Sequence, residues 1–209
     1  MQILSPEEVR VIGSLIEKEN TTPEYYPLTI NSLTNACNQK SSRHPVVSYD
    51  ELFVELTVGK LRDKKLISKV TGPDQRVPKY KQVFTETYNL TQAQTAVLCV
   101  LFLRGAQTIG EIKGRCYRIY EFKDLAETEN TVDELVNFEG GQFVIKLPKD
   151  SGRENRYTHL FCGEPEITIP EKPIPAEEKI TQLENEITIL KENYNSLKEE
   201  FEEFKRSFE

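Results

Sequence analysis

Residues 4–15 read LSPEEVRVIGSL, and residues 90–101 repeat the pattern as LTQAQTAVLCVL. A second echo follows, because the spacing TIxxLxxxC that starts at Thr29 returns as TIxxIxxxC from Thr108. The first copy carries an extra loop, TTPEYYP, at residues 21–27. The sequence therefore predicts two copies of one structural unit within a chain of 209 residues.

Helix starts are marked in both copies by a hydroxyl residue that is followed three positions later by Glu or Gln. This pattern of a capping box occurs at residues 5–8, 48–51, 91–94 and 108–111. In the helix expected to open at the capping box of residues 48–51, we expect Leu52, Leu56 and Leu61 to form the stripe that faces the core.

Each copy ends in a predicted β-hairpin. The strands are expected at residues 66–70 and 80–84 in the first copy, and at residues 143–147 and 157–161 in the second. Three helices and a hairpin in about 80 residues describe a winged helix, which is a helix-turn-helix variant. The expected fold is thus mainly α with small β-hairpins, in two tandem winged-helix domains at residues 1–88 and 89–163.

The chain changes character after Gly163. Four prolines punctuate residues 164–178, which are expected to form an extended linker. Residues 179–209 then carry apolar side chains at alternating spacings of three and four, which predicts a C-terminal coiled-coil helix that joins two copies as a dimer. Charges at the flanking positions favour a parallel pair, while the bulky phenylalanines leave open a trimer or docking of that end. The seam positions are Ile180, Leu183, Ile187, Leu190, Tyr194, Leu197, Phe201, Phe204 and Phe208.

Several segments between residues 4 and 162 resemble the YceH-like family. They include EVRVIGS at residues 8–14, ACNQKSSRHPV at residues 36–46, LRGAQT at residues 103–108 and RYTHLF at residues 156–161. The resemblance implies a bacterial protein with two winged-helix domains, and it implies no particular activity. The tail beyond residue 163 lies outside the resemblance.

Composition excludes several classes of function. Of the net charge of −7, the two predicted domains contribute almost nothing, because residues 164–209 hold 6 basic and 13 acidic side chains. We expect no membrane span and no secretory signal, hence a cytoplasmic protein with reduced cysteines. The two histidines, His44 and His159, lie far apart, and no metal-ligand spacing or phosphate-binding loop occurs. The sequence therefore predicts neither an enzyme nor a cofactor.

Basic side chains gather in the first copy, around the expected third helix and the hairpin. If they share one face, they would neutralise DNA phosphates, although a solvent-exposed loop and a favourable helix end explain the same residues. The leading interpretation is a DNA-binding protein that acts in transcription or DNA architecture as a dimer. The candidate nucleic-acid-binding residues are Lys40, Arg43, Lys60, Arg62, Lys64, Arg76 and Lys79.

The third helix of the second copy is acidic, with Glu129, Asp133 and Glu134 and no Lys or Arg between residues 124 and 141. We expect this domain to contact protein rather than DNA. The alternative interpretation for the whole chain is accordingly a winged-helix adaptor that binds other proteins. Arg104 and the segment Tyr120-Glu121-Phe122 fit either a recognition surface or packing between the domains, and packing is favoured.

Overall fold

A computed structural model describes residues 2–71, 77–148 and 154–165, together with six single positions of the tail between residues 187 and 198. The chain divides into two units, Met1–Ile167 and Thr168–Glu209. In the second unit the described residues are helical and exposed, and they include the predicted seam positions Ile187 and Tyr194. The other predicted seam positions lie outside the described residues.

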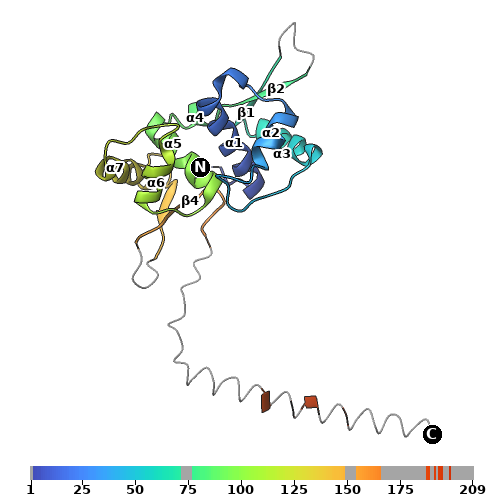
Figure 1. The fold of residues 1–209 in the computed structure, drawn as a ribbon, viewed down its shortest axis with the longest axis vertical. Coiled ribbons are helices and arrows are strands. Elements are labelled where there is room, and N and C mark those ends of the chain that lie inside the picture. Colours follow the sequence, from blue (N-terminus) through green and yellow to red (C-terminus); the bar gives the residue numbers. More distant parts are fainter. Residues whose placement is uncertain are drawn as a thin grey trace, which may run out of the picture. The chain divides into compact units, whose positions relative to one another are not determined.

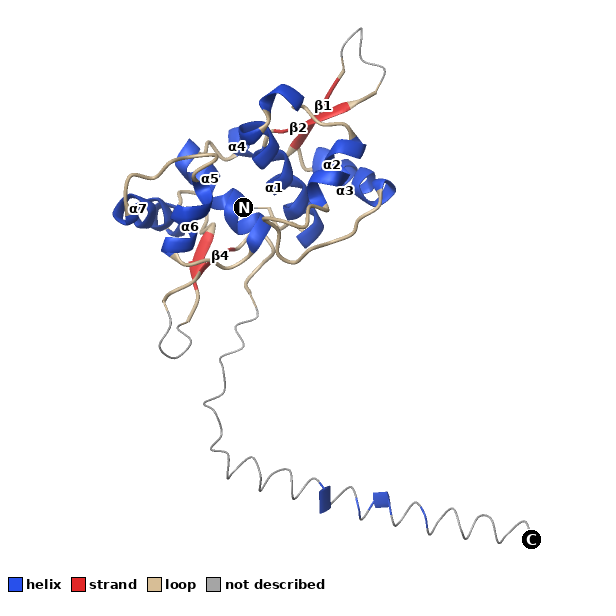
Figure 2. Cartoon of the chain, viewed as in Figure 1, coloured by secondary structure: helices blue, strands red, loops and turns tan. Residues whose placement is uncertain are grey.

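The described part of the first unit is mainly helical with two short antiparallel strand pairs (Figure 1; Figure 2). We call residues 6–82 the first repeat and residues 92–159 the second. The first repeat contains α1 (Pro6–Thr21), the 3-10 helix η1 (Pro23–Tyr25), α2 (Ile30–Cys37), α3 (Glu51–Asp63), β1 (Ile67–Val70) and β2 (Lys79–Gln82). The short α4 (Phe84–Thr87) leads to the second repeat, which contains α5 (Gln92–Arg104), α6 (Ile109–Cys116), α7 (Leu125–Val136), β3 (Val144–Lys146) and β4 (Tyr157–His159).

Apart from η1, the helices and strands of the two repeats correspond one to one, down to the pairing of single residues. Strand β1 pairs with β2 so that Ile67 faces Gln82, and β3 pairs with β4 so that Val144 faces His159. An isolated bridge adds Leu28 beside Tyr80 in the first repeat, and Gln107 beside Tyr157 in the second. The internal repeat and the hairpins predicted from the sequence are therefore present, with slightly shorter strands.

The predicted helix starts are confirmed at three of four places. Capping boxes begin α1 at Ser5, α5 at Thr91 and α6 at Thr108. The fourth expectation is wrong, because Asp50 rather than Ser48 caps α3, with its carboxylate accepting the backbone N–H of Phe53 at 2.7 Å. An Asp immediately before the helix accepts this bond as well as a hydroxyl does, so the cap lies two residues later.

The predicted core stripe of α3 is confirmed at Leu61 but wrong at Leu52 and Leu56. The buried side chains are Val54, Val58 and Leu61, together with Thr57, at the three-and-four spacing of a helix face. Leu52 and Leu56 lie off that face and are 66% and 60% exposed. The positions of the leucines therefore did not identify the side of α3 that faces the core.

The first helices of the two repeats, α1 and α5, pack directly against each other within one continuous core. Gly13 allows this close approach, since a Cβ atom there would lie 3.0 Å from Phe102 Cβ. At the equivalent position of α5, the Cys99 thiol points back at the Gly13 carbonyl, with Sγ 3.5 Å from the oxygen. Equivalent positions thus meet each other, as in the interface of a symmetric dimer.

Candidate functional site

The candidate nucleic-acid-binding residues come from several elements and differ in exposure. Lys60 and Arg62 are exposed near the C-terminal end of α3, Lys40 is exposed on the loop after α2, and Lys79 is half-buried on β2. Arg76 lies outside the described residues. Arg43 and Lys64 have intramolecular partners, which changes their interpretation.

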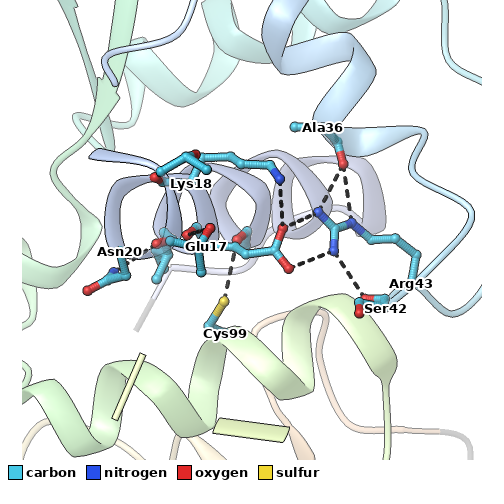
Figure 3. Close-up of polar contacts among 11 residues, drawn as sticks. Glu17, Lys18, Asn20, Ala36, Ser42, Arg43 and Cys99 are labelled. Carbon is cyan, nitrogen blue, oxygen red and sulfur yellow. Dashed lines mark hydrogen bonds and ion pairs between the residues drawn. The ribbon is translucent and has the colours of Figure 1, made fainter. Parts of the chain in front are cut away.

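Arg43 is a structural residue and not a surface contact for phosphate. Its side chain is fully buried, and its guanidinium binds both carboxylate oxygens of Glu17, at 3.1 and 2.5 Å (Figure 3). The same group donates to the Ala36 carbonyl at the end of α2. Burial of Glu17 opposes its ionisation, but the hydrogen bonds and charge of Arg43 outweigh this and hold the pKa of Glu17 below its ordinary value. In this structure the Arg43 guanidinium is therefore occupied by Glu17 and Ala36 and is not available to a phosphate.

Lys64 is likewise tied to its own chain. Its ammonium lies 2.7 Å from Oε2 of the buried Glu8 and 3.1 Å from the Ile3 carbonyl. Glu8 also accepts the Ser5 backbone N–H in the capping box of α1. Lys64 thus neutralises a buried carboxylate at the start of the chain, so it is not free to neutralise a phosphate.

The outward side of α3 carries an apolar patch. We call Leu52, Phe53 and Leu56 the α3 apolar face; their side chains are 66%, 40% and 60% exposed. Tyr49 extends the patch, with its ring centroid 4.9 Å from that of Phe53. Large apolar side chains scattered singly on a surface need no explanation, but a contiguous group on one helix marks an interaction site.

A shallow cleft runs along this face. It has a volume of about 380 Å³ and is lined by Phe53, Glu55, Leu56, Thr57, Gly59, Lys60 and Asp63. A Cβ atom at Gly59 would meet nothing within 4 Å, so the backbone of α3 is open to close approach there. The sequence analysis missed this surface because it assigned Leu52 and Leu56 to the core; the spacing of Val54, Val58 and Leu61 was the available signal.

A second hollow lies beyond the C-terminal end of α3. It has a volume of about 560 Å³ and is lined by Arg62, Asp63, Lys65, Ile67, Ser68, Lys69 and Val83. We call it the basic groove, because three of its lining side chains are cationic and one is acidic. It brings Arg62, from the predicted set, beside two lysines that the set did not include.

The third helix of the second repeat has the acidic surface that its sequence predicts. Glu129, Asp133 and Glu134 are exposed on α7, and a hollow of about 790 Å³ is lined by Asp133, Glu134, Glu139 and neighbouring polar side chains. Leu125, at the start of α7, is 54% exposed. The third helices of the two repeats therefore present different chemistry to solvent.

Tyr120 and Phe122 serve mainly in packing. Phe122 is buried, its ring lies against that of Tyr120, and the Tyr120 hydroxyl donates to Glu127 at 2.7 Å. Arg104, the last residue of α5, is half-buried and lines a separate cavity between the repeats.

Among the described residues, no group of three or more His, Cys, Asp or Glu side chains could hold a metal ion, and no helix is long and apolar enough to cross a membrane. Cys37, Cys99 and Cys116 are buried, and burial raises the pKa of the Cys37 thiol to about 11. Cys162 is exposed. His159 lies against the Phe102 ring, and burial lowers its pKa to about 4.

Comparison with known proteins places the chain in a family. Residues 4–153 match the family model described as "Protein of unknown function, DUF480". A UPF0502 protein of Solibacter usitatus is 48% identical, over 83% of this chain and 82% of the relative. UPF0502 proteins of Vibrio campbellii and Opitutus terrae are 49% and 47% identical, over 77% and 82% of this chain and 76% and 75% of the relatives. This chain therefore belongs to the DUF480 family of bacterial proteins.

Proposed function

We propose that this protein is a non-catalytic adaptor built on two winged-helix repeats, and that its first repeat binds a partner protein through the α3 apolar face. The observation that carries the proposal is the exposure of Leu52, Phe53 and Leu56 on one side of a well-formed helix. Removal of such side chains from water is the main favourable term in protein association.

The chemistry of the surrounding side chains specifies the partner. Glu51 and Glu55 lie toward the N-terminal half of α3, and Lys60 lies toward its C-terminal half. A complementary segment is an amphipathic helix with an apolar stripe, a basic side chain opposite Glu51 and Glu55, and an acidic one opposite Lys60. The open backbone at Gly59 admits a large side chain from such a helix.

The same surface disfavours DNA as the ligand of α3. In a winged helix the third helix enters the major groove, where its N-terminal residues contact bases between two rows of phosphates. Here those residues are Glu51, Leu52, Glu55 and Leu56, so two carboxylates would face the phosphates. The acidic α7 has the same difficulty, so we assign major-groove binding to neither helix.

The test uses a photo-crosslinking amino acid at Phe53 in the full chain, expressed in its host cells. We expect a discrete protein adduct whose linked segment is an amphipathic helix. A synthetic peptide of that segment should bind the purified protein, and Leu52→Gln with Leu56→Gln should weaken that binding at least tenfold. Gln keeps a helix propensity close to that of Leu, so α3 should stay folded.

Leu125→Gln on α7 is the matched control, because Leu125 is also a leucine that is more than half exposed. It should leave peptide binding unchanged. The proposal fails if the linked segment is not an amphipathic helix, if the peptide binds the α3 variant normally, or if Leu125→Gln weakens binding equally.

Nucleic acid is a second candidate ligand, and the basic groove is the observation that favours it. Arg62, Lys65 and Lys69 line one hollow. The phosphates of a DNA duplex that lay there would contact these cations, and α3 would not have to enter the major groove. Binding of random duplex DNA should then weaken with salt, with a slope of two to three in log units, and Lys65→Gln with Lys69→Gln should lower that slope. A flat salt dependence would exclude this mode.

Self-association through the tail completes the proposal. The heptad pattern of residues 179–208 supports a parallel dimer. Sedimentation of the full chain and of a chain ending at Gly163 tests it: a dimer that becomes a monomer on truncation is expected. Two monomers at micromolar concentration would rule the dimer out.

A further inference from the structure

A half-enclosed cavity between the two repeats is lined by arginines. It has a volume of about 160 Å³ and lies where the C-terminal parts of α1 and α5 meet α6 and the turn that follows it. Cys99, Val100 and Leu103 contribute to its wall from α5. Arg104, Arg115 and Arg118 supply its positive charge, and Glu17 is the acidic side chain that lines it.

These arginines lack sufficient negative partners. Within the part of the chain that the structure describes, Arg104 and Arg118 form no side-chain hydrogen bond or ion pair. Arg115 lies 3.5 Å from Glu111, which is shared with Arg156 at 3.1 Å. Glu17 does not balance the cavity, because both its oxygens already bind Arg43. The cavity therefore keeps an excess of positive charge.

The positions of the arginines are fixed by the fold. Arg104 ends α5, Arg115 lies on α6, and Arg118 follows two residues after that helix. Burial and the nearby charge of Arg115 both lower the pKa of Arg104. An anion bound between them would remove this repulsion.

We propose that this cavity binds a phosphate group, held by Arg104, Arg115 and Arg118. A guanidinium presents paired N–H donors that match two phosphate oxygens, and three guanidiniums around one cavity match a dianion. The volume holds one phosphate group but not a whole nucleotide. Tyr117, which is 67% exposed, also lines the cavity and offers an aromatic face to whatever carries the phosphate.

The cavity is lined by residues from both repeats, so a bound ligand would contact both. Glu17 and Ser42 belong to the first repeat, while the three arginines belong to the second. A bound phosphate would therefore add a charged link at the junction of the repeats. This site is independent of the α3 apolar face, so either proposal can fail alone.

Calorimetric titration of the full chain with inorganic phosphate, in low-chloride buffer, tests the proposal. We expect saturable one-to-one binding and a rise in Tm with phosphate. Arg104→Gln and Arg118→Gln should each lower the affinity at least tenfold while leaving the Tm without phosphate unchanged. Lys123→Gln removes an exposed cation that does not line this cavity and should change nothing.

A parallel titration with adenosine monophosphate identifies the source of the phosphate. Tighter binding than inorganic phosphate, reduced to the same level by Tyr117→Ala, indicates a nucleotide; equal binding indicates free phosphate. The proposal is wrong if phosphate does not saturate the protein, if Arg104→Gln binds phosphate normally, or if Lys123→Gln weakens phosphate binding as much as Arg104→Gln does.

Discussion

The two repeats have the same order of α-helices and strands, but they stabilise the loop between their second and third α-helices differently. In the first repeat, the loop between α2 and α3 is fixed by polar contacts: Arg43 binds Glu17, Arg10 donates to the Pro45 carbonyl, and the His44 N–H donates to the Leu103 carbonyl. In the second, the position equivalent to Glu17 is the buried Leu103, and Phe122 fills the core below the connection. One architecture thus tolerates either an ion pair or apolar packing at this joint.

The outward sides of the third helices differ as well. The α3 apolar face has its counterpart in an acidic surface on α7. The buried sides of both helices combine threonine with aliphatic side chains, so the two helices differ mainly on their outward sides.

The largest effect is expected from breaking the buried ion pair. Arg43→Met should lower the free energy of unfolding by about 3–5 kcal/mol, because Glu17 would be left without its partner. The double variant Glu17→Leu with Arg43→Met copies the apolar solution of the second repeat, and we expect it to recover most of that loss. Urea unfolding monitored by circular dichroism measures both.

Lys40→Met is the control for this comparison, since Lys40 lies exposed on the same loop. It should change stability by less than about 0.5 kcal/mol. If the double variant is as unstable as Arg43→Met alone, the first repeat depends on the ion pair in a way that the second does not, and the two joints are not interchangeable.

A pH titration compares the ends of the two hairpins. His159 and Gln82 hold equivalent places, but Gln82 is hydrogen-bonded to Glu19 and Thr85, whereas His159 packs on Phe102 and its buried Nδ1 has no partner. Burial lowers the pKa of His159 to about 4 in the folded protein, against about 6.5 when unfolded. Stability from neutral His159 should be complete above pH ~6.5 and decrease as the pH falls toward ~4, by up to about 3 kcal/mol.

Replacement by the counterpart residue, His159→Gln, should remove this loss between pH ~6.5 and ~4. The substitution also removes the ring contact with Phe102, so the slope of the unfolding free energy against pH is the quantity to compare. If His159→Gln and the unsubstituted protein have the same slope, protonation of His159 does not cause the loss of stability at low pH.

The repeat, the helix order and three capping boxes were predictable because they depend on residues close in sequence. The outcome at Arg43 was not, since Glu17 is 26 positions away and only the folded chain brings the two charges together. A similar reason explains α3: its apolar residues exceed what one face can hold, and the choice between Leu56 and Val58 is made by neighbours from other elements. The arginine cavity combines both repeats, so neither copy alone indicates it.

Substitutions at two glycines compare the tight contact between α1 and α5 with the open surface of α3. Gly13→Ala places a methyl group 3.0 Å from Phe102 Cβ and Leu103 Cδ2, and we expect it to cost about 1–3 kcal/mol by forcing α1 and α5 apart. Gly59→Ala on α3 meets nothing within 4 Å and should instead stabilise the protein by about 0.5–1 kcal/mol. Thermal unfolding of the pair would measure the difference, and equal effects would contradict the close packing at Gly13.

The smallest expected effect concerns the α3 apolar face itself. Leu56→Gln removes an exposed leucine and keeps a good helix former, so the unfolding free energy should change by less than about 0.5 kcal/mol. Leu61→Ala, on the buried side of the same helix, should cost about 2–5 kcal/mol. Leu125→Gln on α7 should be as neutral as Leu56→Gln, because both side chains are more than half exposed.

If Leu56→Gln destabilised the isolated protein by as much as Leu61→Ala, Leu56 would be a core residue, as its sequence first indicated, and the distinction between the third helices would disappear. If it is neutral, the apolar character of this face is not required by folding, and an interaction partner becomes its physical explanation.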